Sequence, residues 1–267
     1  MELRQAALAV LQLPTRADKC AAVKALTPNL FIDNQKTIVV TTKIPVRENL
    51  PHLVPPTQLR KRSLATLQGR AIFLHALAHI EMNAVDLALD VIWRFKGLPF
   101  EFYQNWLQVA QEEVLHFELL NSCLQEMGYV YGDFPAHNGL WEIAERTADD
   151  LLARLALIPR HLEARGLDVT PAMRAKFTQV GLDAVVKALN IIEHDEIGHV
   201  AIGNRWFHYL CQQQGIGALE TFQRLLQDYA APAMRPPFNW EARQAAGFTA
   251  DELAWLASLN PPGAARE

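Results

Sequence analysis

Two copies of one short motif, a glutamate followed three residues later by a histidine, occur at Glu113–His116 and at Glu196–His199. A carboxylate and an imidazole at this spacing project from one face of a helix, about one turn apart, where both could bind the same metal ion. One such motif is weak evidence, because a chain with 29 acidic residues produces it often by chance. The second copy makes a metal site the hypothesis to test.

Each motif is preceded by a lone glutamate at nearly the same distance. The separation of Glu81 from Glu113 is a single residue shorter than that of Glu163 from Glu196. Four helices that carry Glu, Glu-x-x-His, Glu and Glu-x-x-His can place four carboxylates and two imidazoles around one pair of metal ions. The sequence therefore predicts six metal ligands: Glu81, Glu113, His116, Glu163, Glu196 and His199.

All six residues lie in otherwise apolar stripes of their helices. Glu81, for example, shares its helix face with Leu74, Val85 and Ile92. A carboxylate there must be paired, protonated or bound to metal, because a bare buried charge costs several kcal/mol or more. Buried Glu–His pairs that only specify packing are the alternative, but two imidazoles cannot neutralise four carboxylates, whereas two divalent ions can. For Glu81 or Glu163 taken alone, that alternative stays open.

Three further acids adjoin the motifs. Asp195 and Glu112 each directly precede a motif glutamate. A carboxylate commonly accepts the second N–H of a metal-bound imidazole and so fixes its tautomer. We expect Asp195 to orient His116 in this way, with a surface acid as the alternative, and for Glu112 we favour the surface. Glu193 lies on the metal face and could be a spare ligand or a proton carrier.

The first half of the chain predicts short helices, an arm and a long helical hairpin. Residues 2–26 indicate two short helices, and the proline-rich, extended stretch 28–58 indicates an ordered arm over the bundle with at most a short hairpin. Two long helices follow at 63–95 and 99–128, and they meet at Gly97.

The hairpin provides a geometric check on the ligand set. Glu81 precedes Gly97 by the same number of positions by which Glu113 follows it. In an antiparallel hairpin both residues therefore lie about 24 Å from the turn, at a rise of ~1.5 Å per residue. We expect them to face each other at one level.

The second half of the chain predicts further helices. A third long helix is expected at 140–165, with a kink at Pro159. The segment from Gly166 to Pro171 should break it, and Thr170 should cap a new helical segment. The remaining helices are expected at 183–215, at 218–229, and after a capping box at Thr249–Glu252.

These elements together predict an all-α fold. A four-helix bundle occupies residues 63–214. Two N-terminal helices and the arm precede it at 1–62, and a C-terminal helical extension at 215–267 packs on the bundle.

The bulk composition is that of an ordinary soluble chain of 267 residues, with 50% apolar and 20% charged residues. A net charge of −4 gives no electrostatic footprint for nucleic acid, and we expect the basic run Arg60–Arg62 to be solvated. Three widely spaced cysteines indicate a reducing compartment. Since neither a signal peptide nor an apolar run of about 20 residues is evident, we expect a cytoplasmic protein with no membrane partner.

With the six ligands placed, residues 63–214 resemble the ferritin-like di-iron carboxylate superfamily. The strings NIIEHDEIGHVAIGNRWF and HALAHIEMNAVDLALD are similar, more closely, to a bacterial ferritin-like family whose biochemical function is unassigned. The resemblance implies a ferritin-like bundle whose ligand pattern this chain matches at all six positions. The superfamily includes oxygenases, tRNA hydroxylases, ferroxidases and radical-forming reductase subunits, so the fold alone does not choose a function.

Carboxylate-rich sites with two imidazoles suit two iron ions, with manganese or a mixed pair as the alternative. The leading hypothesis is an O₂-activating oxygenase or hydroxylase that acts on a small organic substrate and draws on an electron donor. Glu113 and Glu196 would bridge or chelate the ions and take part in catalysis. A ferroxidase or iron-storage protein is the alternative, a tRNA-modifying hydroxylase the second alternative, and a scaffold with a vestigial site the third.

Two groups of residues outside the ligand set have open roles. His75 and His79 are one turn apart and are expected to face another helix or solvent. The aromatic residues around the first hairpin could form core, a homodimer face or a substrate mouth, with core as the default. They are Trp93, Phe95, Phe100, Phe102, Tyr103 and Trp106.

Overall fold

The computed structural model describes residues 2–59 and 63–259, so the basic run Arg60–Arg62 lies outside the described residues. The chain divides into two compact units, unit 1 at Met1–Glu142 and unit 2 at Ile143–Glu267. The regular structure of the described residues is helical, and their β-type pairing is limited to two isolated bridges. The predicted all-α fold is confirmed.

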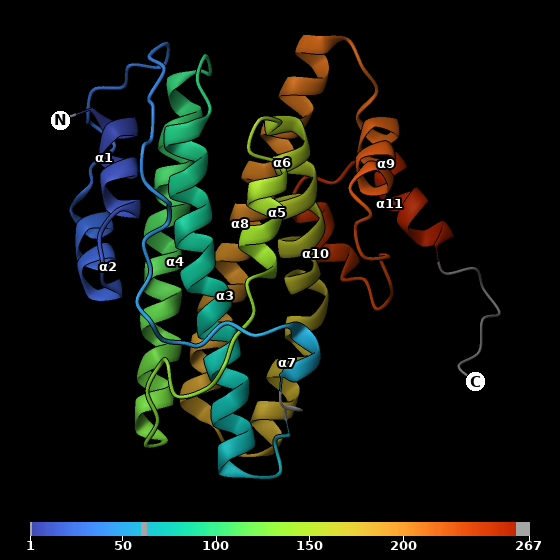
Figure 1. The fold of residues 1–267 in the computed structure, drawn as a ribbon. Coiled ribbons are helices and arrows are strands. Elements are labelled where there is room, and N and C mark those ends of the chain that lie inside the picture. The colour runs from blue at the N-terminus through green and yellow to red at the C-terminus, as the bar shows by residue number, and fades with distance from the viewer. Residues whose placement is uncertain (1, 60–62, 260–267) are drawn as a thin grey trace. The chain divides into compact units, whose positions relative to one another are not determined.

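A long antiparallel hairpin of α3 (Leu67–Arg94) and α4 (Phe100–Glu126) forms the centre of unit 1, as Figure 1 shows. The Thr66 side chain accepts the amide of Gly69 and so caps the first turn of α3. Gly97, at φ +81°, makes the turn between the helices, where only glycine is unstrained. Both helices match their predicted positions to within a few residues.

Two short helices, α1 (Leu3–Leu11) and α2 (Arg16–Ala25), pack against this hairpin. The buried Arg4 donates to the carbonyl oxygens of Ile92, at 3.3 Å, and Trp93, at 2.8 Å. Those carbonyls belong to the last turn of α3, which has no helical partners for them. The buried Arg4 therefore caps the C-terminal end of α3 by binding two of its free carbonyl oxygens.

The arm after α2 is ordered, as predicted, and carries one short 3₁₀ turn, η1 (Pro56–Gln58). Its backbone bonds to α1 through Val46 N and Leu11 O, at 2.8 Å. It bonds again to the loop after α4 through Val54 N and Ala136 O, also at 2.8 Å. The arm thus lies over unit 1 without forming a hairpin of strands among the described residues.

Of the described helices, α3 has the length and composition that could cross a membrane. In its most apolar window, however, 72% of the residues are buried inside the protein. Core helices of globular proteins meet the same test, so burial explains the apolar character of α3.

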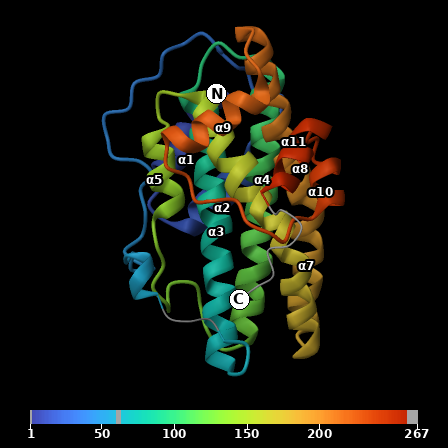
Figure 2. The ribbon, with the colours of Figure 1, turned by 90° about the vertical axis from the view of Figure 1, so that its right-hand side faces the viewer.

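In unit 2, helices α6 (Leu151–Leu157) and α7 (Ala164–Gln179) are joined by a π-helix, η2 (Ile158–Glu163). The wide turn accommodates Pro159, which lacks an N–H and would crowd the carbonyl four residues earlier in a regular helix. The long α8 (Asp183–Gln214) lies beside α7 (Figure 2). Its start at Asp183 agrees with the prediction.

The prediction of one helix over 140–165 is wrong, because the chain forms α5 (Gly139–Arg146) and then restarts at α6. Asp150 caps α6 by accepting the amide of Ala153. The buried Arg154 then donates to Thr147 Oγ1, at 2.7 Å, and to the carbonyl of Ala144. The interruption is thus stabilised by side chains of the connecting segment and of α6, together with a backbone carbonyl of α5.

The predicted break at Gly166–Pro171 is also wrong, since α7 continues through both residues. Pro171 cannot donate to the carbonyl of Leu167, but Asn239 does so from the C-terminal extension, at 3.2 Å. Thr170, expected as a cap, instead donates its hydroxyl to Gly166 O, at 2.9 Å. A partner distant in sequence thus satisfies the group that the proline leaves open.

The C-terminal extension forms α9 (Ala218–Asp228), α10 (Trp240–Ala245) and α11 (Ala250–Ser258). The predicted capping box of Thr249 and Glu252 is present at the start of α11. The extension closes a small core against α7 and α8, which includes the buried residues Ala164, Leu167, Val200, Phe248 and Leu256.

Candidate metal centre

Three predicted ligands meet in unit 1 and are named here the hairpin group: Glu81 on α3, with Glu113 and His116 on α4. Nδ1 of His116 lies 3.5 Å from Oε2 of Glu81 and 3.5 Å from Oε2 of Glu113. The exposed fraction is 6% for Glu81 and 0% for the other two residues. The equal level expected for the two glutamates is therefore confirmed.

The hairpin group concentrates negative charge away from water. Burial raises the pKa of Glu81 well above its usual range, and the neighbouring Glu113 carboxylate raises it further. Burial alone would lower the pKa of His116, but the carboxylates of Glu113 and Glu81 outweigh it and raise that pKa to about 11. Two carboxyl groups and one imidazole thus compete for protons away from water, and a divalent cation could take the place of those protons.

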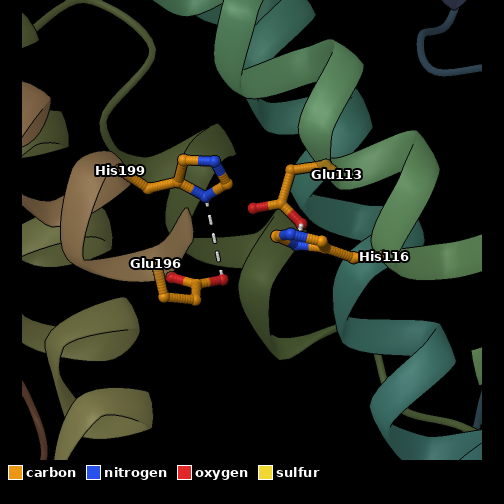
Figure 3. A group of neighbouring side chains, drawn as sticks. All are labelled: Glu113, His116, Glu196 and His199. Carbon is orange, nitrogen blue, oxygen red and sulfur yellow. Dashed lines mark ion pairs between the residues drawn. The ribbon is translucent and has the colours of Figure 1, made fainter. Parts of the chain in front are cut away.

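The second motif forms the α8 pair, Glu196 and His199, in unit 2. Figure 3 draws this pair together with Glu113 and His116 and marks an ion pair within each motif. Nδ1 of His199 lies 3.8 Å from Oε1 of Glu196, and the histidine is 1% exposed. Oε2 of Glu196 is buried and has no hydrogen-bond partner among the described residues. A buried carboxylate oxygen in that state is costly, and a metal ion is one group that would satisfy it.

Glu163, the sixth predicted ligand, ends the π-helix η2 and is half-buried. The packing of η2 on α8 depends on Gly203, where a Cβ atom would lie 2.3 Å from Cβ of Pro159 and 2.6 Å from its Cγ. The absence of a side chain at Gly203 therefore lets the segment that carries Glu163 approach α8. Gly203 has no role in the sequence prediction, because a single glycine on an apolar helix face does not by itself indicate a close packing contact.

The three additional acids have different surroundings. Glu112 is half-buried and accepts a hydrogen bond from Gln108 one turn earlier on α4, at 2.9 Å. Glu193 forms an ion pair with Arg174 of α7. Asp195 is half-buried on α8. Their predicted roles beside the metal stay predictions.

We expected His75 and His79 to face another helix or solvent, and this prediction is wrong. The loop after α4 covers both side chains. Nδ1 of His79 is hydrogen-bonded to the Tyr131 hydroxyl, at 2.7 Å, and Nε2 of His75 accepts the amide of Gly132, at 2.9 Å. Burial lowers the pKa of each histidine to about 4. Both are uncharged core residues at neutral pH.

The aromatic residues around the hairpin turn are mostly core, as the default interpretation had it. Trp93, Phe102, Tyr103 and Trp106 are each at most 4% exposed, whereas Phe100 is 58% exposed.

A family model described as a protein of unknown function, DUF455, matches residues 12–254. The chain belongs to this family. A similar protein is an uncharacterized protein of Haemophilus influenzae, 45% identical over 253 residues, which cover 90% of this chain and 88% of the relative. No solved structure matches the chain. The DUF455 description gives no activity, so the residues themselves must indicate the function.

Each of the two motifs in this DUF455 protein offers a carboxylate and an imidazole that could bind a metal ion, Glu113 with His116 in unit 1 and Glu196 with His199 in unit 2. Structural zinc sites are usually rich in cysteine thiolates, whereas carboxylate and imidazole donors without cysteine suit iron and manganese. The donor chemistry therefore fits the metals that the sequence predicts.

Proposed function

We propose that this protein is a di-iron carboxylate oxygenase or hydroxylase that activates O₂ and oxidises a small organic substrate. The observation that carries the proposal is the hairpin group, in which one buried imidazole lies 3.5 Å from each of two buried carboxylates. Such a group is costly as an apo arrangement and favourable as a metal-binding one.

The proposed centre joins the hairpin group to Glu163, Glu196 and His199, so that each of two ions receives one imidazole. Four carboxylates balance the charge of two divalent cations, and this balance is the reason to propose two ions rather than one. Iron is proposed first, with manganese or a mixed pair as the alternative. When bound, the ions would supply the electrons that reduce O₂.

The residues of the chain would bind and orient the ions and exclude water. Glu113 and Glu196 would be the central carboxylate ligands of the ions, and Glu81 and Glu163 would be further carboxylate ligands. Val114 and Phe117, at 0% and 5% exposure, flank the α4 ligands and keep solvent away from them. Asp195 is proposed as the acceptor that fixes the tautomer of an imidazole ligand.

The ordered arm favours an oxygenase over an iron-storage protein. Its backbone forms hydrogen bonds with α1 and with the loop after α4, so it covers part of unit 1. A bundle that only stores iron does not need such an additional segment. An oxygenase requires a closed pocket, a small-molecule substrate and an electron donor. We propose that this protein acts in the cytoplasm. The tRNA-modifying hydroxylase is the weaker proposal, because the net charge is −4.

Oxidation of Fe(II) by the loaded protein separates the oxygenase from the ferroxidase. We expect each chain to oxidise about two Fe(II) ions with O₂ and then to stop until a reductant is added. Continued oxidation of a large excess of Fe(II), with growth of a soluble ferric mineral, would instead identify a ferroxidase. Retention of the oxidised iron by the protein after gel filtration checks the first outcome.

A further inference from the structure

Unit 1 contains a cavity of about 210 Å³ that none of the six predicted metal ligands lines. Its walls are the start of α2, the arm segment 46–53, the side of α3 that carries Met82 and Asp86, and Tyr131. The cavity is thus built from four stretches of one unit.

A buried ammonium group lines one wall of this cavity. Lys19 is 3% exposed, and its Nζ lies 2.9 Å from Oδ1 of Asp86, which is 2% exposed. A lysine ammonium has three N–H donors. Among the described residues, Asp86 is the hydrogen-bond partner of Nζ, so two donors are available to a molecule in the cavity.

Two arginines add charge to the walls. Arg16 pairs with Glu48 of the arm, and its guanidinium carbon lies 4.7 Å from the centre of the Tyr131 ring. Arg47 donates to Asn83 Oδ1 at 2.7 Å and lies with Nε 3.5 Å from Oδ2 of Asp86. Three cationic side chains therefore face two carboxylates, which leaves one positive charge unbalanced.

The remaining wall is largely apolar and includes Val46, Leu50, Leu53, Met82 and Tyr131. The volume lies below the roughly 300–1,000 Å³ of pockets that hold drug-sized ligands. A fitting ligand is therefore short, carries a single negative charge at one end and has an apolar body.

We propose that this cavity binds a short monocarboxylate. Its carboxylate accepts from the two remaining donors of Lys19 Nζ and from the Arg16 guanidinium, and its apolar body packs against Met82 and Tyr131. Doubly charged inorganic phosphate fits less well, because one unbalanced positive charge cannot neutralise it and the apolar wall has nothing to contact. The site stands on unit 1 alone and does not depend on the proposed metal centre.

Binding is tested by calorimetric titration of the metal-free full-length protein with hexanoate and benzoate. Hexanamide and inorganic phosphate serve as the neutral and the doubly charged comparison. We expect at least one carboxylate to bind with a dissociation constant below about 1 mM, and both comparison compounds to bind at least ~10-fold more weakly.

A double variant, Lys19→Met with Asp86→Leu, removes the ammonium without leaving its carboxylate buried and unpaired. It also leaves the net charge of the walls unchanged, so it isolates the donors of Lys19. We expect it to weaken carboxylate binding by ~10-fold or more. Arg16→Gln, at a half-buried position, should weaken carboxylate binding as well. It replaces the double variant as the test if the double variant does not fold.

Lys24→Met is the matched control, because it removes a positive charge from the exposed side of the same helix, where Lys24 pairs with Glu118. It should leave binding within about twofold of the wild type. The proposal is overturned if neither carboxylate binds, if phosphate or hexanamide binds equally well, or if Lys24→Met weakens binding as much as the cavity variants.

Discussion

The Oε2 atom of Glu81 lies 3.5 Å from Nδ1 of His116, although the two residues belong to different helices. The contact depends on the turn at Gly97, which places the two helices side by side, with Glu81 and Glu113 equally far from it. Glu113 approaches the same nitrogen to the same distance. Half of the proposed ligand set is therefore brought together by one helical hairpin.

The packing of η2 on α8 gives a first prediction. A methyl group at position 203 would lie 2.3 Å from Cβ of Pro159, so Gly203→Ala must displace the π-helix that carries Glu163. We expect a loss of about 1–3 kcal/mol in the free energy of unfolding. Urea denaturation measures the loss, and elemental analysis shows whether iron occupancy falls with it.

Gly198→Ala is the control for this prediction, because it lies on the same helix with nothing within 4 Å of the added Cβ. It should stabilise the protein by up to about 1 kcal/mol, since alanine favours the helix over glycine. Equal stability of the two variants would mean that η2 does not depend on Gly203.

The buried cluster around Glu252 gives a prediction of pH dependence. Burial would raise the pKa of this carboxyl, but the hydrogen bond from His208 and the guanidinium of Arg160 outweigh it and lower the pKa from 4.5 to about 2. Because the folded-state pKa is depressed, the resulting stability is present above pH 4.5 and is lost as the pH falls toward 2. Its size at neutral pH is about 3 kcal/mol.

Glu252→Gln should therefore destabilise the protein at pH 7 and leave Arg160 buried without its carboxylate. The difference from the wild type should shrink steadily below about pH 4. Asp251→Asn, at the exposed neighbouring position, is the control and should cost about 0.5 kcal/mol or less. A difference between wild type and Glu252→Gln that stays constant with pH would rule out this electrostatic origin.

The predicted role of Asp195 is tested by Asp195→Asn, which keeps the shape of the side chain. If the carboxylate fixes an imidazole ligand, iron affinity should fall by about 10- to 100-fold while the free energy of unfolding of the metal-free protein hardly changes. Competition with a chelator of known affinity measures the first quantity. Asp183→Asn, in the first turn of the same helix, should leave affinity unchanged, and an equal effect of both variants would assign Asp195 to the surface.

The sequence was sufficient for the elements whose signals are local. The hairpin of α3 and α4 follows from Gly97, Pro99 and an apolar periodicity, and the level of Glu81 and Glu113 follows from counting residues along two straight helices. The capping box before α11 is likewise local, because its two side chains bond within one turn.

The failures concern groups whose partners are distant in the sequence. The continuity of α7 through Pro171 depends on Asn239, which donates to the carbonyl that the proline leaves open. His75 and His79 are buried because the loop containing Tyr131 folds back over α3. Periodicity identifies which side chains share a helix face, but it does not identify what covers that face.

Iron stoichiometry after anaerobic loading with Fe(II) tests the central claim most directly. We expect about two ions per chain in the wild type and in Glu118→Ala, an exposed position on α4. Combining Glu113→Ala with His116→Ala should abolish binding, because it removes two of the three ligands in the hairpin group. Fewer than one ion per wild-type chain, or about two ions retained by the double variant, would contradict the proposed metal centre.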